Sequence, residues 1–195
     1  IVAKDLGLMT KILQLVNSSF FGLRTHVSDP EQAVALLGVD TIKSLMLSSQ
    51  VFAQFDQSRL PSFSLEDLWR HAILTGTCAR RIAKDAGANQ QVIDEACTAA
   101  LLHDVGVLVL AANKPEDYAR VHDLMRRERL SDWAAEREVF GADHAHVGAY
   151  LLGIWGLGDG IIEAVAFHQH PGECQASGFT SVTAVHVADA IAEQQ

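Results

Sequence analysis

The chain has 195 residues, of which 49% are apolar, and its 24 acidic and 15 basic side chains give a formal net charge of −9. This length lies near the top of the range for one domain and could also hold two lobes. The negative charge argues against a nucleic-acid surface, because such a surface needs clustered Lys and Arg to displace counterions. The 3 cysteines lack Cys-x-x-Cys spacing, so we expect neither a disulfide framework nor a thiolate zinc site. Free thiols and the absence of a secretory pattern indicate a cytoplasmic protein.

The first residues already follow a helical pattern, in which Ile1, Leu6, Met9, Leu13 and Val16 share one face. Because the chain opens inside this pattern and without Met, we expect an excised part of a longer protein with a truncated first helix. No membrane-spanning segment is expected. The longest apolar stretch, Ala99 to Ala112, is too short to cross a bilayer and contains His103 and Asp104.

Helix signals in the first part of the chain predict an N-terminal helical lobe over residues 1–60. Ser28-Asp-Pro-Glu31 has the pattern of a capping box, and Gly38 is the expected stop of that helix. Asp40 is expected to cap the next helix, which runs to about Gln54. The polar stretch 55–63, which contains Pro61, is the predicted linker to a C-terminal lobe over residues 61–195.

The second part of the chain contains a succession of helix starts and no strand pattern. The expected starts are, in chain order, Ser64, Asn89, Pro115, Ser131, Asp143, Asp159 and Thr180. The apolar run Val107–Leu110 is long enough for a strand, but one isolated strand builds no sheet. No other stretch alternates with period two between turn signals. The sequence therefore predicts an all-α fold.

Residue types that ligate metals recur among these apolar helices. His103 and Asp104 adjoin one another in the stretch Ala99-Ala-Leu-Leu-His-Asp-Val-Gly106, whose apolar neighbours predict a buried site. Adjacent residues on a helix point about 100° apart, so both reach one ion only if it lies beside the helix end. We therefore expect Gly106 to mark a break in the helix. The full series of candidate residues is His71, His103, Asp104, His144, His168 and Asp189.

Buried groups of this kind have three possible roles: they bind a metal, pair with one another, or act on a substrate. Imidazole nitrogen beside carboxylate oxygen suits Mn, Fe, Zn, Ni or Mg ions. Without an ion, the same residues would form a His–Asp network that cross-links a helical core. Of the remaining histidines, His186, His26 and His122 are expected to be hydrogen-bonded core residues, and His146 and His170 to lie at the surface or beside the site.

The order of these residues resembles the HD superfamily of metal-dependent phosphohydrolases, here at His71, His103, Asp104 and Asp189. Further blocks resemble its HDOD branch, the HD-related output domain. They are Leu13-Gln-Leu-Val-Asn-Ser-Ser-Phe-Phe-Gly22, Ala33-Val-Ala-Leu-Leu-Gly38, Ile42-Lys-Ser-Leu45, Leu68-Trp-Arg-His71, Leu101-Leu-His-Asp-Val-Gly106, Glu138-Val-Phe-Gly-Ala-Asp-His-Ala-His-Val-Gly148, Leu151-Leu-Gly-Ile-Trp155 and Phe167-His-Gln-His-Pro171. Single blocks are weakly specific, but eight in this order are highly specific.

The resemblance implies an all-helical HDOD domain over residues 1–195 in a bacterial signal-transduction protein. Such domains are attached to receiver or other signalling modules, so a response regulator of a two-component system is the expected parent. The family often has His-His-x-Pro where this chain has His168-Gln-His-Pro171. In the related HD-GYP phosphodiesterases a Gly-Tyr-Pro segment follows, whereas Gly172-Glu-Cys follows here.

Two functions follow from these observations. The first is a non-catalytic output module that acts through protein–protein contact. Its expected associations are an upstream receiver, protein partners and a homodimer, and neither nucleic acid nor membrane is an expected partner. The second is a metal-dependent phosphohydrolase acting on a nucleotide or cyclic nucleotide, in which Asp104 and His144 would be catalytic. Only one cation, Arg70, adjoins the candidate residues in sequence, and a phosphoester needs positive charge. The scarcity of positive charge favours the output module, in which a divalent metal is expected to be bound at partial occupancy or to be absent.

Overall fold

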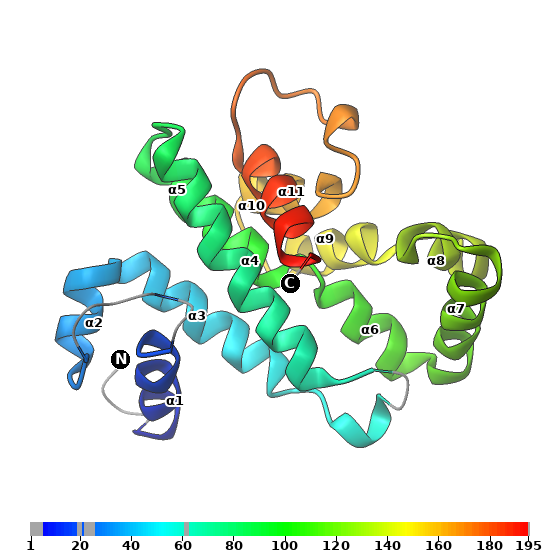
Figure 1. The fold of residues 1–195 in the computed structure, drawn as a ribbon, viewed down its shortest axis with the longest axis horizontal. Helices are drawn as coiled ribbons and strands as arrows, with labels where there is room; N and C mark the ends of the chain where they lie inside the picture. Colours follow the sequence, from blue (N-terminus) through cyan, green and yellow to red (C-terminus); the bar gives the residue numbers. More distant parts are fainter. Residues whose placement is uncertain (1–5, 19–20, 22–25, 61–62, 195) are drawn as a thin grey trace.

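The computed structural model describes residues 6–18, 21, 26–60 and 63–194, and the regular elements in these ranges are all helical (Figure 1). The predicted all-α fold is therefore confirmed. The helices are α1 (Leu6–Val16), α2 (Pro30–Leu37), α3 (Val39–Phe52), α4 (Leu65–Asp85), α5 (Gln90–Leu102), α6 (Val105–Asn113), α7 (Pro115–Glu128), α8 (Asp132–Phe140), α9 (His144–Ile154), α10 (Asp159–Phe167) and α11 (Ser181–Ala192), with short 3-10 turns η2 (Gln57–Arg59) and η3 (Pro171–Glu173).

The long helices α4 and α5 form the centre of the molecule. Helix α11 packs against both of them, α10 packs against α5 and α11, and α1, α2 and α3 lie together on the other side (Figure 1). Buried side chains of the first lobe, such as Ile12 and Leu45, share a core with Ile73 of α4 and Leu101 of α5. Helices α7 and α8 project from the far end, where they pack mainly against each other.

Two predicted caps in the first lobe are wrong by one or two residues. Asp29 rather than Ser28 caps α2, because its side chain accepts a hydrogen bond from the Glu31 amide at 2.8 Å. Asp40 lies inside α3, which begins directly after Gly38. Gly38 joins the two helices with a φ of +88°, a conformation that residues with a Cβ rarely adopt. This leaves no room for a separate capping residue between α2 and α3.

The helix starts of the second lobe are confirmed. Ser64, Asn89 and Asp143 each accept a hydrogen bond from a backbone amide in the first turn of the helix that follows. Pro115 is the first residue of α7, where its missing N–H has no helical partner to lose. Local capping chemistry therefore sets most of the helix boundaries here.

The break expected near the His–Asp pair is present, but Gly106 does not cause it. Helix α5 ends at Leu102 and α6 begins at Val105, so His103 and Asp104 themselves form the break. Gly106 lies inside α6, where an added Cβ would meet the His144 carbonyl oxygen at 2.0 Å. The glycine is thus needed for the close approach of α6 to the start of α9.

Residues Gln90–Asn113, which span α5 and α6, are long and apolar enough to cross a membrane by length and composition. Their mean hydropathy of 1.6 has another explanation in this fold, since 67% of the window is buried among the other helices. The buried positions include Ala99, Leu102 and Val105, which belong to the main apolar core. The apolar character of this segment is accounted for by that core.

The close approach at Gly106 predicts the outcome of a single substitution. Gly106→Ala should lower the free energy of unfolding by about 3 kcal/mol, because the new methyl group overlaps backbone atoms of His144 that cannot move freely. Chemical denaturation followed by circular dichroism measures the change. Gly153→Ala in α9 is the matched control, since its Cβ would find only Ile162 Cδ1 at 3.8 Å. Equal stability of the two variants would contradict this packing.

Candidate metal centre

The structure brings all six candidate residues together. His71 lies in the second turn of α4, His103 and Asp104 in the break between α5 and α6, and His144 at the first position of α9. His168 follows the last residue of α10, and Asp189 lies in α11. The ends or faces of six helices therefore meet at one buried point. The ligand atoms form three overlapping groups, and within each group they lie within 4.8 Å of one another.

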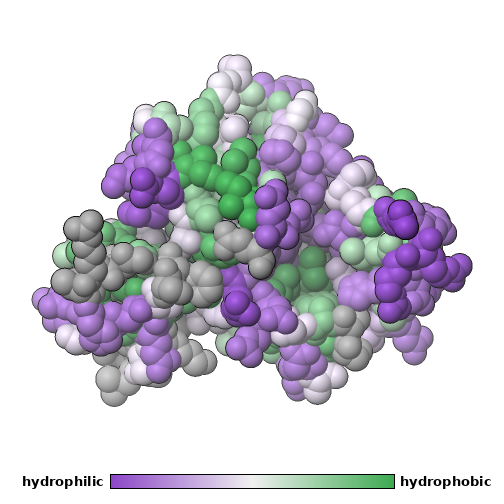
Figure 2. Space-filling view, in the orientation of Figure 1, coloured by the Kyte–Doolittle hydropathy of each residue, from purple (hydrophilic) through white to green (hydrophobic). Residues whose placement is uncertain are grey.

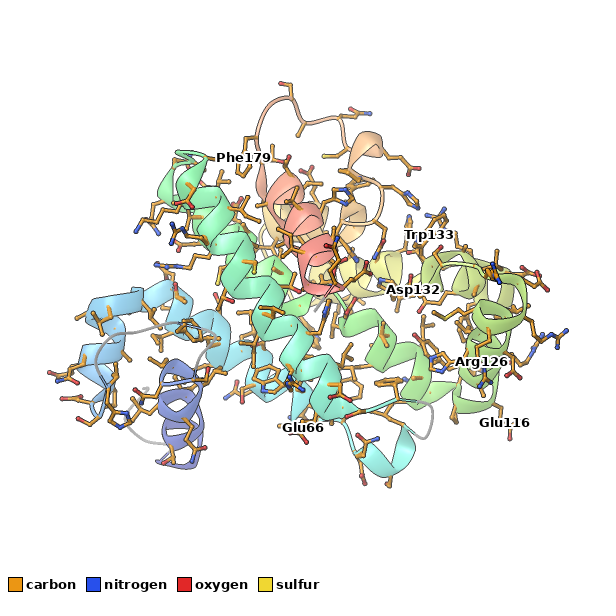
Figure 3. The ribbon with its side chains drawn as sticks, viewed as in Figure 1. Glu66, Glu116, Arg126, Asp132, Trp133 and Phe179 are labelled. Carbon is orange, nitrogen blue, oxygen red and sulfur yellow. The ribbon has the colours of Figure 1, made fainter. Side chains whose placement is uncertain are left out.

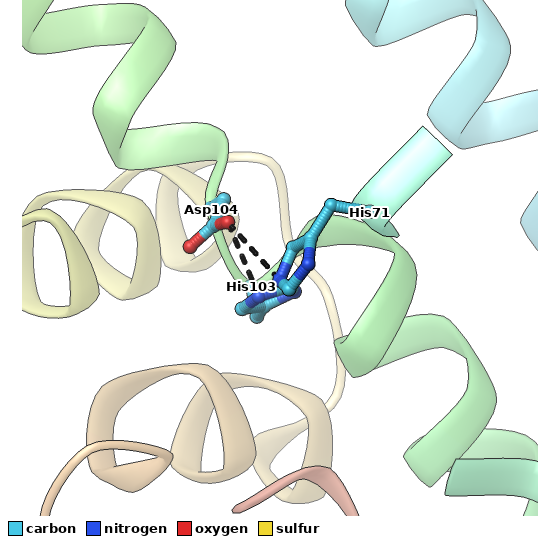
Figure 4. Close-up of side chains that lie close together, drawn as sticks. All are labelled: His71, His103 and Asp104. Atoms are coloured by element: carbon cyan, nitrogen blue, oxygen red, sulfur yellow. Dashed lines mark ion pairs between the residues drawn. The ribbon is translucent and has the colours of Figure 1, made fainter. Parts of the chain in front are cut away.

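One side of the cluster is built around Asp189. Its Oδ1 atom lies 2.9 Å from His71 Nε2 and 3.3 Å from His103 Nε2. Asp104 Oδ2 approaches the same two imidazoles, at 3.2 Å from His103 Nε2 and 3.8 Å from His71 Nε2 (Figure 4). Two carboxylates and two imidazoles thus face a common point.

The other side of the cluster is built around His144 and His168. Asp104 Oδ1 lies 3.6 Å from His144 Nε2, so Asp104 presents one oxygen to each side. The Nε2 atoms of His144 and His168 are 3.3 Å apart. Both imidazoles are fully buried, as is that of His103.

Helix ends fix the orientation of two of these imidazoles. His103 Nδ1 donates to the Ala100 carbonyl and His168 Nδ1 donates to the Val165 carbonyl, each at 2.7 Å and three residues back. Both histidines directly follow the last residue of a helix, α5 or α10, where the final carbonyls lack intrahelical partners. With Nδ1 occupied in this way, Nε2 faces the centre of the cluster.

Glu136 of α8 fixes the third imidazole, and the sequence analysis missed it. Its fully buried carboxylate accepts hydrogen bonds from Tyr118 Oη at 2.9 Å, and from the backbone N and the Nδ1 atom of His144 at 2.7 Å. One sequence signal could have revealed it. Glu136 is spaced three and four residues from Val139 and Phe140, so it is a charged residue on an apolar helix stripe.

These atoms fit a divalent cation. His103 Nε2 is buried and makes no hydrogen bond, although two carboxylate oxygens lie near it. The facing Nε2 atoms of His144 and His168 would repel one another as two lone pairs unless a proton or a cation lies between them. Ligand atoms bound to one ion at about 2.1 Å are about 3.0–3.4 Å apart, and the separations of 3.2, 3.3 and 3.3 Å in this cluster lie within that range. Nitrogen and oxygen donors together suit Mn, Fe, Zn or Ni.

Protons take the place of a cation in the metal-free cluster. Burial by itself would lower the pKa of His144, but the hydrogen bond to Glu136 and the charges of Glu136 and Asp104 raise it to about 9. Burial and the charges of His103 and His144 lower the pKa of His168 to about 3. Although burial would raise the pKa of Asp104 and of Asp189, the charge of His103 holds both below their ordinary range.

A cleft of about 410 Å³ opens onto this cluster at His71 and Asp104. The cleft is otherwise lined by Phe63, Ser64, Asp67, Leu68, Val107, Tyr118, His122, Met125 and Asp132. Asp132 lies at the start of α8 (Figure 3), and burial together with the charges of Asp104 and Glu136 raises its pKa despite the nearby His144. No Lys or Arg is among these lining residues. The entrance is therefore acidic.

The other histidines lie outside the cluster. His186 donates from Nδ1 to the His168 carbonyl at 2.7 Å, as expected for a hydrogen-bonded residue. The core position predicted for His26 is wrong, because this side chain is exposed. His122 is half-buried and lines the acidic cleft. His146 is exposed and bonds to Asp143, and His170 packs against Trp133 with ring centroids 4.4 Å apart.

The HDOD domain family matches residues 1–171, and the chain belongs to that family. Asp189 lies beyond the matched residues, yet it completes the cluster. An HDOD domain protein with unknown function from Geobacter sulfurreducens has the same fold, with a TM-score of 0.85 and 23% identity, over 100% of this chain and 64% of that one.

Two further relatives extend the comparison. The MmoQ response regulator of Methylococcus capsulatus (Bath) is 27% identical, with a TM-score of 0.58, over 98% of this chain and 75% of that one. An uncharacterized protein of Treponema pallidum (strain Nichols) is 27% identical over 173 residues, which are 87% of this chain and 32% of that protein. The chain thus spans about a third of the curated relative that it matches.

Binding of a divalent ion should release protons from the cluster. At pH 7.5 His144 is protonated in the metal-free protein, because its pKa is raised to about 9, and a metal ligand must be deprotonated. Titration calorimetry with Zn²⁺ or Mn²⁺ in buffers of different ionisation enthalpy measures the number released. We expect the apparent binding enthalpy to depend on the buffer at pH 7.5, because His103 and His144, whose pKa values are both raised, must give up protons to bind the ion. Binding without any buffer dependence would contradict the protonated state.

Glu136→Gln tests the support given to His144. The amide keeps the size of the side chain but removes the charge that orients the imidazole, so metal affinity should fall by about 10- to 100-fold. Competition with a chromogenic chelator measures it. Glu138→Gln on the same helix is the control and should leave the affinity unchanged. Equal affinities in the two variants would show that Glu136 has no part in holding the ion.

Proposed function

We propose that this chain is the output domain of a cytoplasmic bacterial signalling protein, such as a response regulator, and that it acts through contact with other proteins. In this proposal the His–Asp cluster holds a divalent metal that stabilises the domain rather than one that turns over substrate. The main observation in support of this proposal is the lining of the cleft in front of the cluster. Asp67, Asp104 and Asp132 line this entrance, and no Lys or Arg is among its lining residues.

This acidic entrance disfavours a phosphoester substrate. Hydrolysis of a phosphoester requires positive charge around the phosphate oxygens. Arg70, the nearest cation in sequence, is 64% exposed and lies 3.7 Å from Asp67. It lines a different cleft, which faces the first lobe. A phosphate approaching His71 and Asp104 would therefore meet carboxylates before it met the metal.

Exposed apolar side chains support a role in protein contact. Tyr150, Ile154 and Trp155 at the end of α9 are 75%, 66% and 46% exposed. Figure 2 shows a further apolar area where α4 and α11 lie side by side, and α11 exposes Val187 and Ile191. Exposed apolar groups that gather at one place are typical of interaction surfaces.

The alternative function, a metal-dependent phosphohydrolase acting on a nucleotide or cyclic nucleotide, has one observation in its favour. The cluster is not closed, because His71 and Asp104 both line the cleft. A metal there would have a side open to water, and metal-bound water is the nucleophile of such enzymes.

A hydrolysis assay separates the two functions. The domain, loaded in turn with Mn²⁺, Fe²⁺, Zn²⁺ and Ni²⁺, should show no turnover of bis-p-nitrophenyl phosphate or of cyclic dinucleotides above that of its Asp104→Ala variant. Metal-dependent turnover that disappears in Asp104→Ala would contradict the proposal and establish the phosphohydrolase.

A substitution away from the cluster tests the contact role. Tyr150→Ser combined with Ile154→Ser should leave the melting temperature nearly unchanged, since both side chains are mostly exposed. The same pair in the parent protein should reduce its signalling output in cells, measured as changes in transcript levels. Two exposed polar residues, Glu116 and Glu128 of α7, changed together to Ser, serve as the control. An unchanged output with the apolar pair replaced would contradict a role for this surface.

A further inference from the structure

A third cleft, of about 470 Å³ and distinct from the one that Arg70 lines, lies between the first lobe and the C-terminal half of α4. Its lining residues are Phe21, Leu37, Thr77, Arg80, Arg81, Lys84 and Asp85, none of which belongs to the His–Asp cluster or to its entrance. Arg80 is nine residues beyond His71 on α4, which is about 13 Å along the helix axis. The cleft is therefore separate from the candidate metal centre.

The cations of this cleft lie along one side of α4. Arg80 and Lys84 are four residues apart and so are neighbours on the helix surface, with Thr77 one turn before them. Like charges at this spacing repel each other and destabilise a helix. An anion between them would remove this repulsion.

Carboxylates do not neutralise these charges. The one acidic residue of the cleft, Asp85, pairs with Arg81 at 2.6 Å. Arg80 donates from Nη2 to the Leu37 carbonyl at the end of α2, at 3.1 Å, while its buried Nε makes no hydrogen bond. Within the described part of the chain, neither Arg80 nor Lys84 has an ion pair. Two positive charges thus remain together in a chain whose net charge is −9.

We propose that this cleft binds a small phosphorylated ligand of about the size of a nucleotide. Its phosphate oxygens would accept hydrogen bonds from the Arg80 guanidinium, which the Leu37 carbonyl already holds in place, and from the Lys84 ammonium. Phe21 and Leu37 provide an apolar wall for the rest of the molecule. The volume lies within the range of about 300–1,000 Å³ that is typical of small-ligand sites. This inference does not depend on the metal centre.

The test is titration calorimetry of the domain with ADP as the probe. We expect saturable binding that weakens at least about tenfold in Lys84→Gln, since each charge-assisted contact contributes an amount of that order. Lys84 is exposed and has no partner in the described structure, so this variant should keep its fold. Arg80→Gln should weaken binding as well, but it also removes the bond to α2. Arg127→Gln, an equal charge change on the exposed face of α7, should bind ADP as the unmodified domain does.

Two further results decide the location of the site. Asp104→Asn should bind ADP with unchanged affinity, because the proposed cleft lies away from the His–Asp cluster. Loss of binding in Asp104→Asn with retention in Lys84→Gln would place the ligand at the cluster and overturn the proposal. The absence of saturable binding to the unmodified domain at millimolar ADP would overturn it too, and so would equal binding by Lys84→Gln and Arg127→Gln.

Discussion

Two helices of the core, α5 and α6, are separated only by His103 and Asp104, and the rest of the site depends on this interruption. An unbroken helix would point the two side chains about 100° apart along one cylinder. At the break, His103 uses the free Ala100 carbonyl at the end of α5 to fix its ring, and Asp104 presents its two oxygens to different imidazoles. Gly106, the second residue of α6, lets this helix approach the start of α9, which positions His144.

A hydrogen bond from Nδ1 recurs at each buried imidazole of the cluster, and it explains how so many polar groups are buried together. A buried imidazole is destabilising unless its nitrogens are satisfied. His168 bonds to a carbonyl at the end of α10, as His103 does at the end of α5, and His144 bonds to Glu136. Each bond occupies Nδ1 and leaves Nε2 facing the centre. The remaining requirement is a positive charge at that centre, which protons or a metal ion can meet.

The parts of the fold and site that the sequence predicted are those set by local chemistry. Ser64, Asn89 and Asp143 cap helices because a short polar side chain reaches the next free amides, and this depends on few neighbours. The six candidate residues were found because their types and order resemble a known pattern. Asp189 lies in α11, where Val182 and Val185 are buried with it.

The parts that the sequence did not predict depend on contacts between distant segments. Gly106 was expected to break a helix, but its role is the approach of α6 to α9, which no local pattern reveals. Glu136 was missed because its importance comes from a bond to His144 in another helix. Ser28 was predicted as a cap although Asp29, one residue later, has equal capping ability and a better position. The acidic residues of the entrance come from α4, from the break between α5 and α6, and from α8, which are far apart in the sequence.

The central claim is that the His–Asp cluster holds a divalent ion. Metal content by inductively coupled plasma mass spectrometry tests it most directly, on protein prepared without chelators or a polyhistidine tag and on the Asp104→Ala variant. Asp40→Ala, which alters an exposed carboxylate of α3, serves as the control. We expect a divalent metal in the unmodified and control proteins and its loss from Asp104→Ala. Absence of metal from all three folded proteins, even after incubation with Mn²⁺, Fe²⁺, Zn²⁺ or Ni²⁺, would contradict it and leave the cluster as a hydrogen-bonded core network.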